Sequence, residues 1–313
     1  MKIPRAWPWH AIVLAAVAWS AGPRAADGLA ADAALRVAAV PATVQAPPSA
    51  PVTVRDLGAG LHELIFADGS VYRGTLRGLT LQGHGEYVSK AFRYKGDFDE
   101  GIRAGYGTYA WPDGDRYEGQ FAHDRPDGRG KLTFANGDTY EGEVRAGMIE
   151  GEGRYVSRSG DSFEGSFREG RPQGAGVYRF ADGDRYEGEM EDGRIQGRGR
   201  YVSKLGDSVE ADFIDGRPRG IGTWRYSNGD RYDGEIAGLP SGQGVFTYHS
   251  GARYEGEVRG GRPKGRGVLW LPDGSRFEGT FEDGLARADG EIVHSDGSRQ
   301  AARMADGVAE PRP

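Results

Sequence analysis

Cysteine is absent from this 313-residue sequence, and long aliphatic runs are scarce. The chain therefore has no disulfide framework and no thiolate metal site. Only 37% of its residues are hydrophobic, whereas an α/β enzyme of this length needs longer apolar stretches for its buried helices and strands. The composition argues against two ordinary globular domains.

A basic excess is also missing, because 40 Lys and Arg face 46 Asp and Glu, for a net charge of −6. Nucleic-acid binders usually carry a basic excess that neutralises phosphates. We therefore expect no nucleic-acid partner. Glycine, in contrast, is abundant at 53 residues, without the every-third-position spacing of collagen.

The N-terminus has the layout of a bacterial-type secretory signal. Lys2 and Arg5 precede an apolar stretch over residues 11–19, and small residues follow. The stretch is shorter than the ~20 residues of a spanning helix, although an uncleaved anchor is the alternative. We expect a signal peptide over residues 1–26 and an exported protein of the periplasm or cell envelope, free or membrane-associated. Residues 27–57 are rich in Ala, Val and Pro, which predicts an extended or flexible linker.

From residue 58 to residue 298 the chain repeats itself. An aromatic-x-Gly core recurs with spacings of 22 or 23 residues, and Val209 replaces the aromatic residue in one unit. A constant period of this length indicates stacked repeats. The segment 299–313 continues the register as a degenerate last repeat and tail, with Gln300 at the aromatic position. The ten cores begin at Tyr72, Tyr94, Tyr117, Tyr140, Phe163, Tyr186, Val209, Tyr232, Tyr254 and Phe277.

Each unit has the pattern of a β-hairpin. In 186–190 and again in 197–201, aromatic or Gly residues alternate with charged ones, as on the two faces of a strand. We expect a loop over residues 193–197 and tight turns at the Asp-Gly and Asn-Gly dipeptides, such as Asn136-Gly137. The prediction is an all-β fold, an elongated single twisted antiparallel sheet of about ten stacked hairpins.

Glycine inside a strand costs stability and needs a reason. We expect each bare Gly to leave a slot for an aromatic ring from the adjoining strand. One unit would then be too small to bury its rings alone, and stacking would supply the missing wall. On the other face, Glu on one strand and Arg or Lys on the next predict a cross-strand ladder of ion pairs.

The pattern Phe163-Glu164-Gly165-Ser166-Phe167 through Gly174-Ala175-Gly176 resembles the MORN (membrane occupation and recognition nexus) repeat. The resemblance covers about residues 60–298. It implies a groove-shaped antiparallel sheet and scaffolding or membrane-associated roles. The unit with Val209 and Ala211 departs from the pattern, which puts its local packing in doubt.

A second periodicity concerns the loops. Arg-Pro occurs in every other one, and an apolar residue (Ile102, Ile149, Ile195 or Leu239) takes its place in those between. We expect these loops to form one edge of guanidinium groups interleaved with apolar tips, which could bind an anionic partner or lipid headgroups. Passively copied turn chemistry with solvated arginines is the alternative. The candidate residues are Arg125, Arg171, Arg217, Arg219, Arg262 and Lys264.

Other motifs do not support catalysis. The Gly-Asp-Ser triplets at 160–162 and 206–208 resemble a hydrolase serine block, but they occupy the repeat turn and no helix follows. The Asp-Gly-Asp turns lack the six to eight oxygens of a Ca²⁺ site. The histidines show no paired metal spacing. We expect no enzyme activity, no cofactor and no metal site.

We therefore expect a non-catalytic scaffold that binds protein partners through an extended grooved surface. One alternative is association with an anionic membrane through the Arg-Pro edge. Another is glycan or cell-wall binding through exposed aromatics such as Trp111, Trp224 and Trp270. Because terminal strands leave backbone groups unpaired, end-to-end homo-oligomers are also expected.

Overall fold

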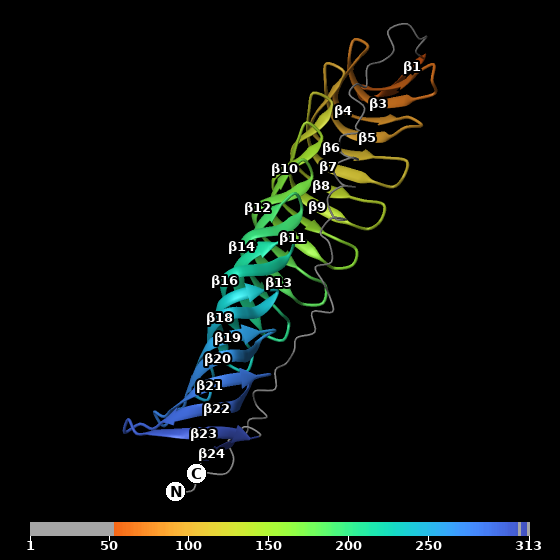
Figure 1. Ribbon diagram of the computed structural model, residues 1–313. Coiled ribbons are helices and arrows are strands. Elements are labelled where there is room, and N and C mark those ends of the chain that lie inside the picture. The colour runs from red at the N-terminus through yellow and green to blue at the C-terminus, as the bar shows by residue number, and fades with distance from the viewer. Residues whose placement is uncertain (1–52, 306–307, 312–313) are drawn as a thin grey trace. The chain divides into compact units, whose positions relative to one another are not determined.

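From residue 71 to residue 305, two kinds of strand alternate, one of seven and one of nine residues. In the computed structural model, which describes residues 53–305 and 308–311, β7 (Arg116–Ala122) is followed by β8 (Arg125–Thr133). Two residues form the turn between them, and the loop 134–138 leads into the next strand. Each hairpin with its loop makes up one period, and the strands form an open antiparallel sheet. The expected all-β fold of hairpin repeats is confirmed (Figure 1).

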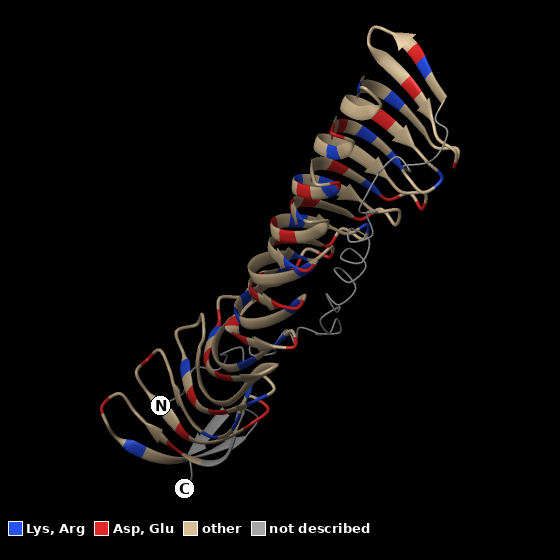
Figure 2. Ribbon diagram, turned by 90° about the horizontal axis from the view of Figure 1, so that it is seen from above, with Lys and Arg blue, Asp and Glu red and all other residues tan. Residues whose placement is uncertain are grey.

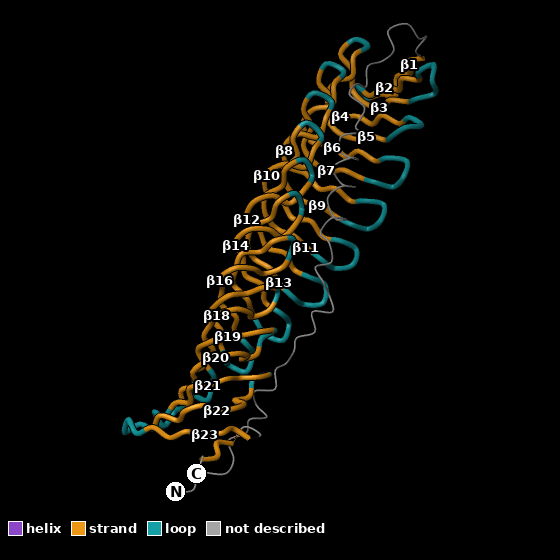
Figure 3. Tube along the Cα trace, in the orientation of Figure 1, coloured by secondary structure: helices purple, strands orange, loops and turns teal. Residues whose placement is uncertain are grey.

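Strands occupy most of the described residues, and the connections between them are short (Figure 3). The first strands are β1 (Thr53–Gly58), β2 (Leu61–Ile65), β3 (Val71–Arg77), β4 (Thr80–Val88), β5 (Arg93–Asp99), β6 (Ile102–Ala110), β7, β8, β9 (Thr139–Arg145), β10 (Met148–Val156), β11 (Ser162–Arg168) and β12 (Arg171–Arg179). The others are β13 (Arg185–Glu191), β14 (Arg194–Val202), β15 (Ser208–Ile214), β16 (Arg217–Arg225), β17 (Arg231–Ala237), β18 (Leu239–Thr247), β19 (Arg253–Arg259), β20 (Arg262–Trp270), β21 (Arg276–Glu282), β22 (Leu285–Val293), β23 (Arg299–Ala305) and β24 (Val308–Pro311).

The described residues fall into two units. The N-terminal unit contains residues 53–182 and 189–194, and the C-terminal unit contains residues 183–188 together with those from 195 onward. The expected signal peptide (1–26) and most of the linker lie outside the described residues. The first strand begins at Thr53, ahead of the boundary expected at residue 58.

Most of the two-residue tight turns have a left-handed backbone at both residues. Asp192 has φ 48° and Gly193 has φ 79°, the geometry of a type I′ turn that matches the twist of the strands it joins. The expectation of a loop over residues 193–197 is wrong, because these two residues already reverse the chain and β14 begins at Arg194. The Asn-Gly and Asp-Gly dipeptides lie in the longer loops instead. There the Gly137 N–H donates to the Phe134 carbonyl (2.9 Å), and the Phe134 N–H to that of Asp138 (2.9 Å).

The core of each hairpin is an aromatic ring that lies over two glycines. Gly96 on β5 and Gly107 on β6 pair directly, and a methyl group built on Gly107 would lie 2.6 Å from the Tyr94 hydroxyl. Tyr94 itself is fully buried, and its hydroxyl donates to the Asp97 carbonyl (2.9 Å). The glycines therefore make room for a ring, as expected. The ring, however, comes from the same hairpin and not from a neighbouring one.

Contacts between hairpins come from a second aromatic position. The Tyr94 ring meets Phe98 of its own strand edge-on at 5.0 Å between ring centroids, and it meets Phe121 of the next hairpin at 5.1 Å. In the C-terminal unit, Tyr254 contacts Phe281 in the same way at 4.8 Å. A hairpin thus buries its own glycines and depends on the following one to cover its ring.

The unit with Val209 and Ala211 keeps the register of the others. Gly199 pairs with Ala211 and Tyr201 pairs with Val209. Both small side chains are buried, and the slot over Gly222 is filled by the Ala211 methyl group and by Ile236. The loss of a ring is therefore compensated locally by two aliphatic groups.

Candidate functional site

The Arg-Pro dipeptides do not lie in loops but open the nine-residue strands. On β8, Pro126 is buried opposite Phe121, whereas Arg125 is exposed opposite Ala122. Because side chains alternate along a strand, the proline is part of the core and the arginine faces outward. The structure thereby assigns the two residues different roles.

The expected row of apolar tips is wrong for half of its members. Ile149 and Ile195 occupy the position of the proline and are buried, and the exposed position before them is taken by Met148 and Arg194. Of the four expected tips, Ile102 and Leu239 are exposed at the position of the arginine. A shift of one residue within a strand exchanges the two faces, and the sequence spacing alone did not reveal it.

The six candidate cations lie at the turn ends of the hairpins and divide between the units. Arg125 and Arg171 are in the N-terminal unit, and Arg217, Arg219, Arg262 and Lys264 are in the C-terminal unit. None of the six has an acidic side chain within 4.0 Å in the described part of the chain. Arg171 faces Arg168 across its turn, and Arg262 faces Arg259. Like charges so placed repel each other, and the sequence reading missed the two partners.

Acidic and basic residues are interspersed over the strands (Figure 2). Many of them form ion pairs. Cross-strand pairs occur, such as Arg198–Glu210 at 3.4 Å, as expected. Others lie within one strand, where the first arginine contacts the acid two residues later. These same-strand pairs are Arg116–Glu118 (3.1 Å), Arg185–Glu187 (2.7 Å), Arg231–Asp233 (2.6 Å), Arg253–Glu255 (2.6 Å) and Arg276–Glu278 (2.6 Å).

One outward position differs from hairpin to hairpin. It is the residue between the two glycines of the nine-residue strand, and its side chain is exposed in every hairpin from β4 to β20. We call this set the display position. Its residues are His84, Tyr106, Arg129, Glu152, Ala175, Arg198, Ile221, Gln243 and Arg266.

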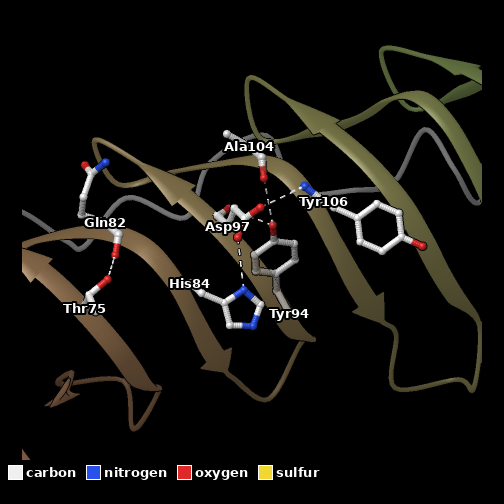
Figure 4. A network of polar contacts seen from close by, with 7 residues as sticks. All are labelled: Thr75, Gln82, His84, Tyr94, Asp97, Ala104 and Tyr106. Carbon is white, nitrogen blue, oxygen red and sulfur yellow. Dashed lines mark hydrogen bonds and ion pairs between the residues drawn. The ribbon is translucent and has the colours of Figure 1, made fainter. Parts of the chain in front are cut away.

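In three hairpins a polar side chain of the seven-residue strand, on the same outward face, accepts a hydrogen bond from the backbone N–H of the display position. The Asp97 carboxylate accepts from the Tyr106 backbone N–H (3.3 Å) and contacts His84 Nδ1 (3.1 Å) (Figure 4). Gln120 and Glu235 accept in the same manner from the N–H groups of Arg129 (2.8 Å) and Gln243 (3.1 Å). The backbone is thus fixed while the displayed side chain is free to vary.

The Gly-Asp-Ser triplets have a structural role. Asp161 accepts a hydrogen bond from the Ala181 N–H (2.8 Å) in the following loop of the same unit, and Asp207 accepts from the Ser227 N–H (2.8 Å). In the same way, Asp115 accepts from the Ala135 N–H (2.8 Å), and Asp138 accepts from the Arg158 N–H (2.7 Å). The signal in the sequence is an aspartate at one register of the repeat, but its partner lies in the next repeat.

The buried tyrosines stay protonated well above neutral pH. Burial raises the pKa of Tyr72 and of Tyr109 to about 12, and it raises the pKa of Tyr94 further. A protonated hydroxyl donates, as Tyr72 does to the Thr75 carbonyl (2.9 Å). These hydroxyl groups support the fold and are not poised for proton transfer.

The tryptophans are less accessible than a glycan platform requires. Trp224 is 3% exposed, which corrects its expected exposure. Trp111 and Trp270 are half-buried, and Arg253 lies 4.7 Å from the centre of the Trp270 ring. Among the described residues, no three His, Asp or Glu side chains are grouped as metal ligands. In the same residues no helix has the length and hydropathy to cross a membrane.

The solved structures to which this chain is similar share little sequence with it. The TCP10 domain of Danio rerio CPAP, in complex with a peptide of Danio rerio STIL, is 12% identical and matches 81% of this chain and 100% of its own, with a TM-score of 0.35. The Drosophila melanogaster SAS-4 TCP domain, in complex with a proline-rich motif of Ana2, is 13% identical over 57% of this chain and 86% of its own, with a TM-score of 0.30. No curated protein sequence matches significantly.

The family comparison is more specific. The model of the MORN repeat matches eight successive segments: residues 94–116, 117–139, 140–162, 163–185, 186–207, 210–231, 236–253 and 254–276. Six of the eight segments begin at the aromatic residue whose ring lies over the glycine pair, and the segments together span more than half of the chain. The chain belongs to the MORN repeat family.

Proposed function

We propose that this chain is a non-catalytic repeat scaffold that binds a protein partner through the outward face of its hairpins. The display position carries the proposal. Its side chain is exposed in successive hairpins and changes from Tyr106 to Arg129 to Glu152, while the rings and glycines beneath it recur. A recognition surface built from repeats needs a core that is the same in every repeat and an exposed side chain that differs between repeats. The MORN repeat is, in general, a non-catalytic family.

Affinity capture with crosslinking from the native host tests the proposal. A display variant (Tyr106→Ser, Arg129→Ser and Glu152→Ser) is compared with a loop variant (Pro112→Ala, Ala135→Ser and Arg158→Ala) in the same unit. We expect the wild-type chain and the loop variant to retain one partner that the display variant loses. Equal recovery with both variants, or no specific partner with the wild type, would contradict the proposal.

We further propose that the scaffold acts after export, in the periplasm or cell envelope. The basic, apolar and small segments of residues 1–26 support this placement. Fractionation of the host with an antibody to the chain tests it, and recovery in the cytosol alone would rule it out.

Association with an anionic membrane is a second candidate function. The observation in its favour is the facing pair Arg168 and Arg171, which no acidic group neutralises within 4.0 Å in the described part of the chain. Replacement of Arg171, Arg217 and Arg262 by alanine should then lower binding to phosphatidylserine vesicles. Unchanged binding would exclude this function.

A further inference from the structure

Two loops of the repeat array carry asparagine followed by glycine. Asn136-Gly137 lies between β8 and β9 in the N-terminal unit, and Asn228-Gly229 lies between β16 and β17 in the C-terminal unit. Both asparagines are exposed to solvent. The proposed binding surface lies on the strands and uses neither of them, so these loops can be considered for a chemistry of their own.

This dipeptide is chemically reactive. The backbone nitrogen of the glycine can attack the side-chain Cγ of the asparagine, so that a C–N bond forms, ammonia leaves and a succinimide ring results. Water then opens the ring at either carbonyl and yields aspartate or isoaspartate. Glycine favours the attack because it has no side chain in the way and its backbone is the most flexible. The loops nevertheless require glycine here, because Gly137 has φ 95° and Gly229 has φ 93°.

In the folded chain, hydrogen bonds hold both reacting groups at Asn136. The Gly137 N–H donates to the Phe134 carbonyl (2.9 Å), so the attacking nitrogen is engaged. Asn136 Oδ1 accepts from the Asp138 N–H (2.9 Å), and Asn136 Nδ2 donates to Asp138 Oδ2 (2.7 Å). The attack requires the amide to rotate and the glycine nitrogen to leave its acceptor, so these bonds must break first.

The loop at Asn228 has the same arrangement. The Gly229 N–H donates to the Tyr226 carbonyl (2.9 Å). Asn228 Oδ1 accepts from the Asp230 N–H (2.9 Å), and Asn228 Nδ2 donates to Asp230 Oδ2 (2.9 Å). Asp230 is buried and also accepts from the His249 N–H (2.9 Å) in the following loop. Each loop therefore holds its reactive dipeptide through the aspartate that follows it.

One of the two products fits the fold. Conversion of Asn136 to aspartate gives Asp-Gly-Asp, which is the native sequence of the loop at 113–115. There the Asp113 carboxylate accepts from the Asp115 N–H (3.2 Å), as the Asn136 amide does from that of Asp138. Isoaspartate does not fit, because it inserts one more carbon atom into the backbone between the residues that close the loop.

We propose that Asn136 and Asn228 are latent deamidation sites, with water as the second reactant, and that each loop keeps its site closed through the following aspartate. Deamidation then proceeds only while the loop is open. The rate at each site therefore reports how often that loop opens, and the folded protein retains its amides.

The first test compares the full chain in its folded and unfolded states. Both are incubated in mildly alkaline buffer, one without and one with urea, and peptide mapping by mass spectrometry measures aspartate and isoaspartate at each site. We expect deamidation at both asparagines to be slower by about tenfold or more in the folded protein. Equal rates in the two states would show that the loops give no protection and would overturn the proposal.

Two variants test the role of the aspartates. Asp138→Ala removes the acceptor of the Asn136 amide and should speed deamidation of the folded protein at Asn136 about fivefold, relative to the rate of the same variant in urea. Asn228 in the same molecule is the control and should react at its wild-type rate. Asp230→Ala should give the reverse pattern.

A conservative variant separates the loss of the hydrogen bond from a general loosening of the loop. Asp138→Asn keeps a side-chain oxygen as acceptor and should restore slow deamidation at Asn136. Circular dichroism verifies that each variant folds. An unchanged rate at Asn136 in Asp138→Ala, or an equal rise at both asparagines, would show that the following aspartate does not close the site and would overturn the proposal.

Discussion

Glycine beneath an aromatic ring is the residue-level device on which the hairpins depend. On Gly96 an added methyl group would lie 2.6 Å from the Tyr94 hydroxyl and 2.5 Å from the Cα of Gly107. Neither neighbour can withdraw, because the ring is buried and the other atom is backbone. Ala211 occupies the position on β15 that is equivalent to Gly96. In that hairpin Val209 replaces the aromatic ring, so the methyl group has room.

We therefore predict that Gly96→Ala destabilises the protein by about 1–3 kcal/mol through overpacking. Tyr94→Val combined with Gly96→Ala copies the Val209 and Ala211 pair, and its loss should be smaller than the sum of the two single losses. Urea unfolding measures the stability of Gly96→Ala, of Tyr94→Val and of the double variant. Thr108→Ala on the outward face is the control. Strict additivity would contradict the steric account.

Arg103 is the exception among the core positions. It occupies the register of the buried prolines, is fully buried, and its Nε lies 3.2 Å from Asp124 Oδ1. Its guanidinium group also lies 5.2–5.8 Å from the ring centres of Phe92, Tyr94 and Tyr109. A buried ion pair of this kind is costly to break but gives little net stability as a pair.

Removal of one partner should thus cost more than removal of both. Asp124→Ala should destabilise the protein by about 3–5 kcal/mol, because it leaves a buried guanidinium without its carboxylate. Arg103→Pro with Asp124→Gly matches Pro172 on β12 and Gly193 in the turn of the following hairpin, where the Gly193 N–H donates to the Pro172 carbonyl (2.9 Å), and should restore most of that loss. Thermal denaturation compares the variants, and a double variant as unstable as Asp124→Ala would contradict this account.

At the scale of elements, the hairpins are joined at both ends by repeated hydrogen bonds. In the loops, a carboxylate such as that of Asp161 accepts from the next loop, and in the turns the Gly170 N–H donates to the Ile149 carbonyl of the preceding hairpin (2.9 Å). These contacts supplement the sheet ladder where strands end. They explain why an aspartate recurs at the end of the longer loops.

Asp161→Ala should weaken this junction by about 1–2 kcal/mol, because the Ala181 N–H loses its acceptor. Hydrogen exchange should show faster exchange of the Ala181 amide. Glu164→Ala, which removes only an exposed contact to Arg179 at 4.0 Å, should leave that amide unchanged. Equal exchange rates in both variants would show that the carboxylate does not hold the loop.

The period, the strand alternation and the glycine slots could be predicted from the sequence, because each leaves a mark within one repeat. The role of Asp161 could not, since its partner is in the next repeat. The sequence also did not reveal where each nine-residue strand begins. Because the turn has only two residues, the strand starts earlier than expected, which buries Ile149 and Ile195 and exposes Arg194. Arg103 reads as an exposed charge until the rings around it are seen. Arg168 and Arg259 escaped notice because only the strand register places them opposite Arg171 and Arg262.

At the scale of the whole molecule, the buried tyrosines set an upper pH limit for folding. Burial raises the pKa of Tyr72, Tyr109 and Tyr232 from 10.0 to about 12. A raised folded-state pKa stabilises the protein fully below pH 10 and loses that contribution as pH rises from 10 to 12. Urea unfolding should show falling stability across this window and little change between pH 8 and 9.5. Constant stability to pH 12 would contradict the burial of these hydroxyl groups.

The two faces of the sheet have different roles. The inward face holds the rings and glycines of the core, and the outward face binds the partner in the proposed function. Lysines mark the two classes of surface: Lys95, Lys131 and Lys264 are exposed outward residues of strands, whereas Lys90 and Lys204 lie in loops. Lysine-reactive crosslinking of the captured partner, mapped by mass spectrometry, tests the claim most directly. We predict crosslinks from the strand lysines, and crosslinks confined to Lys90 and Lys204 would contradict it.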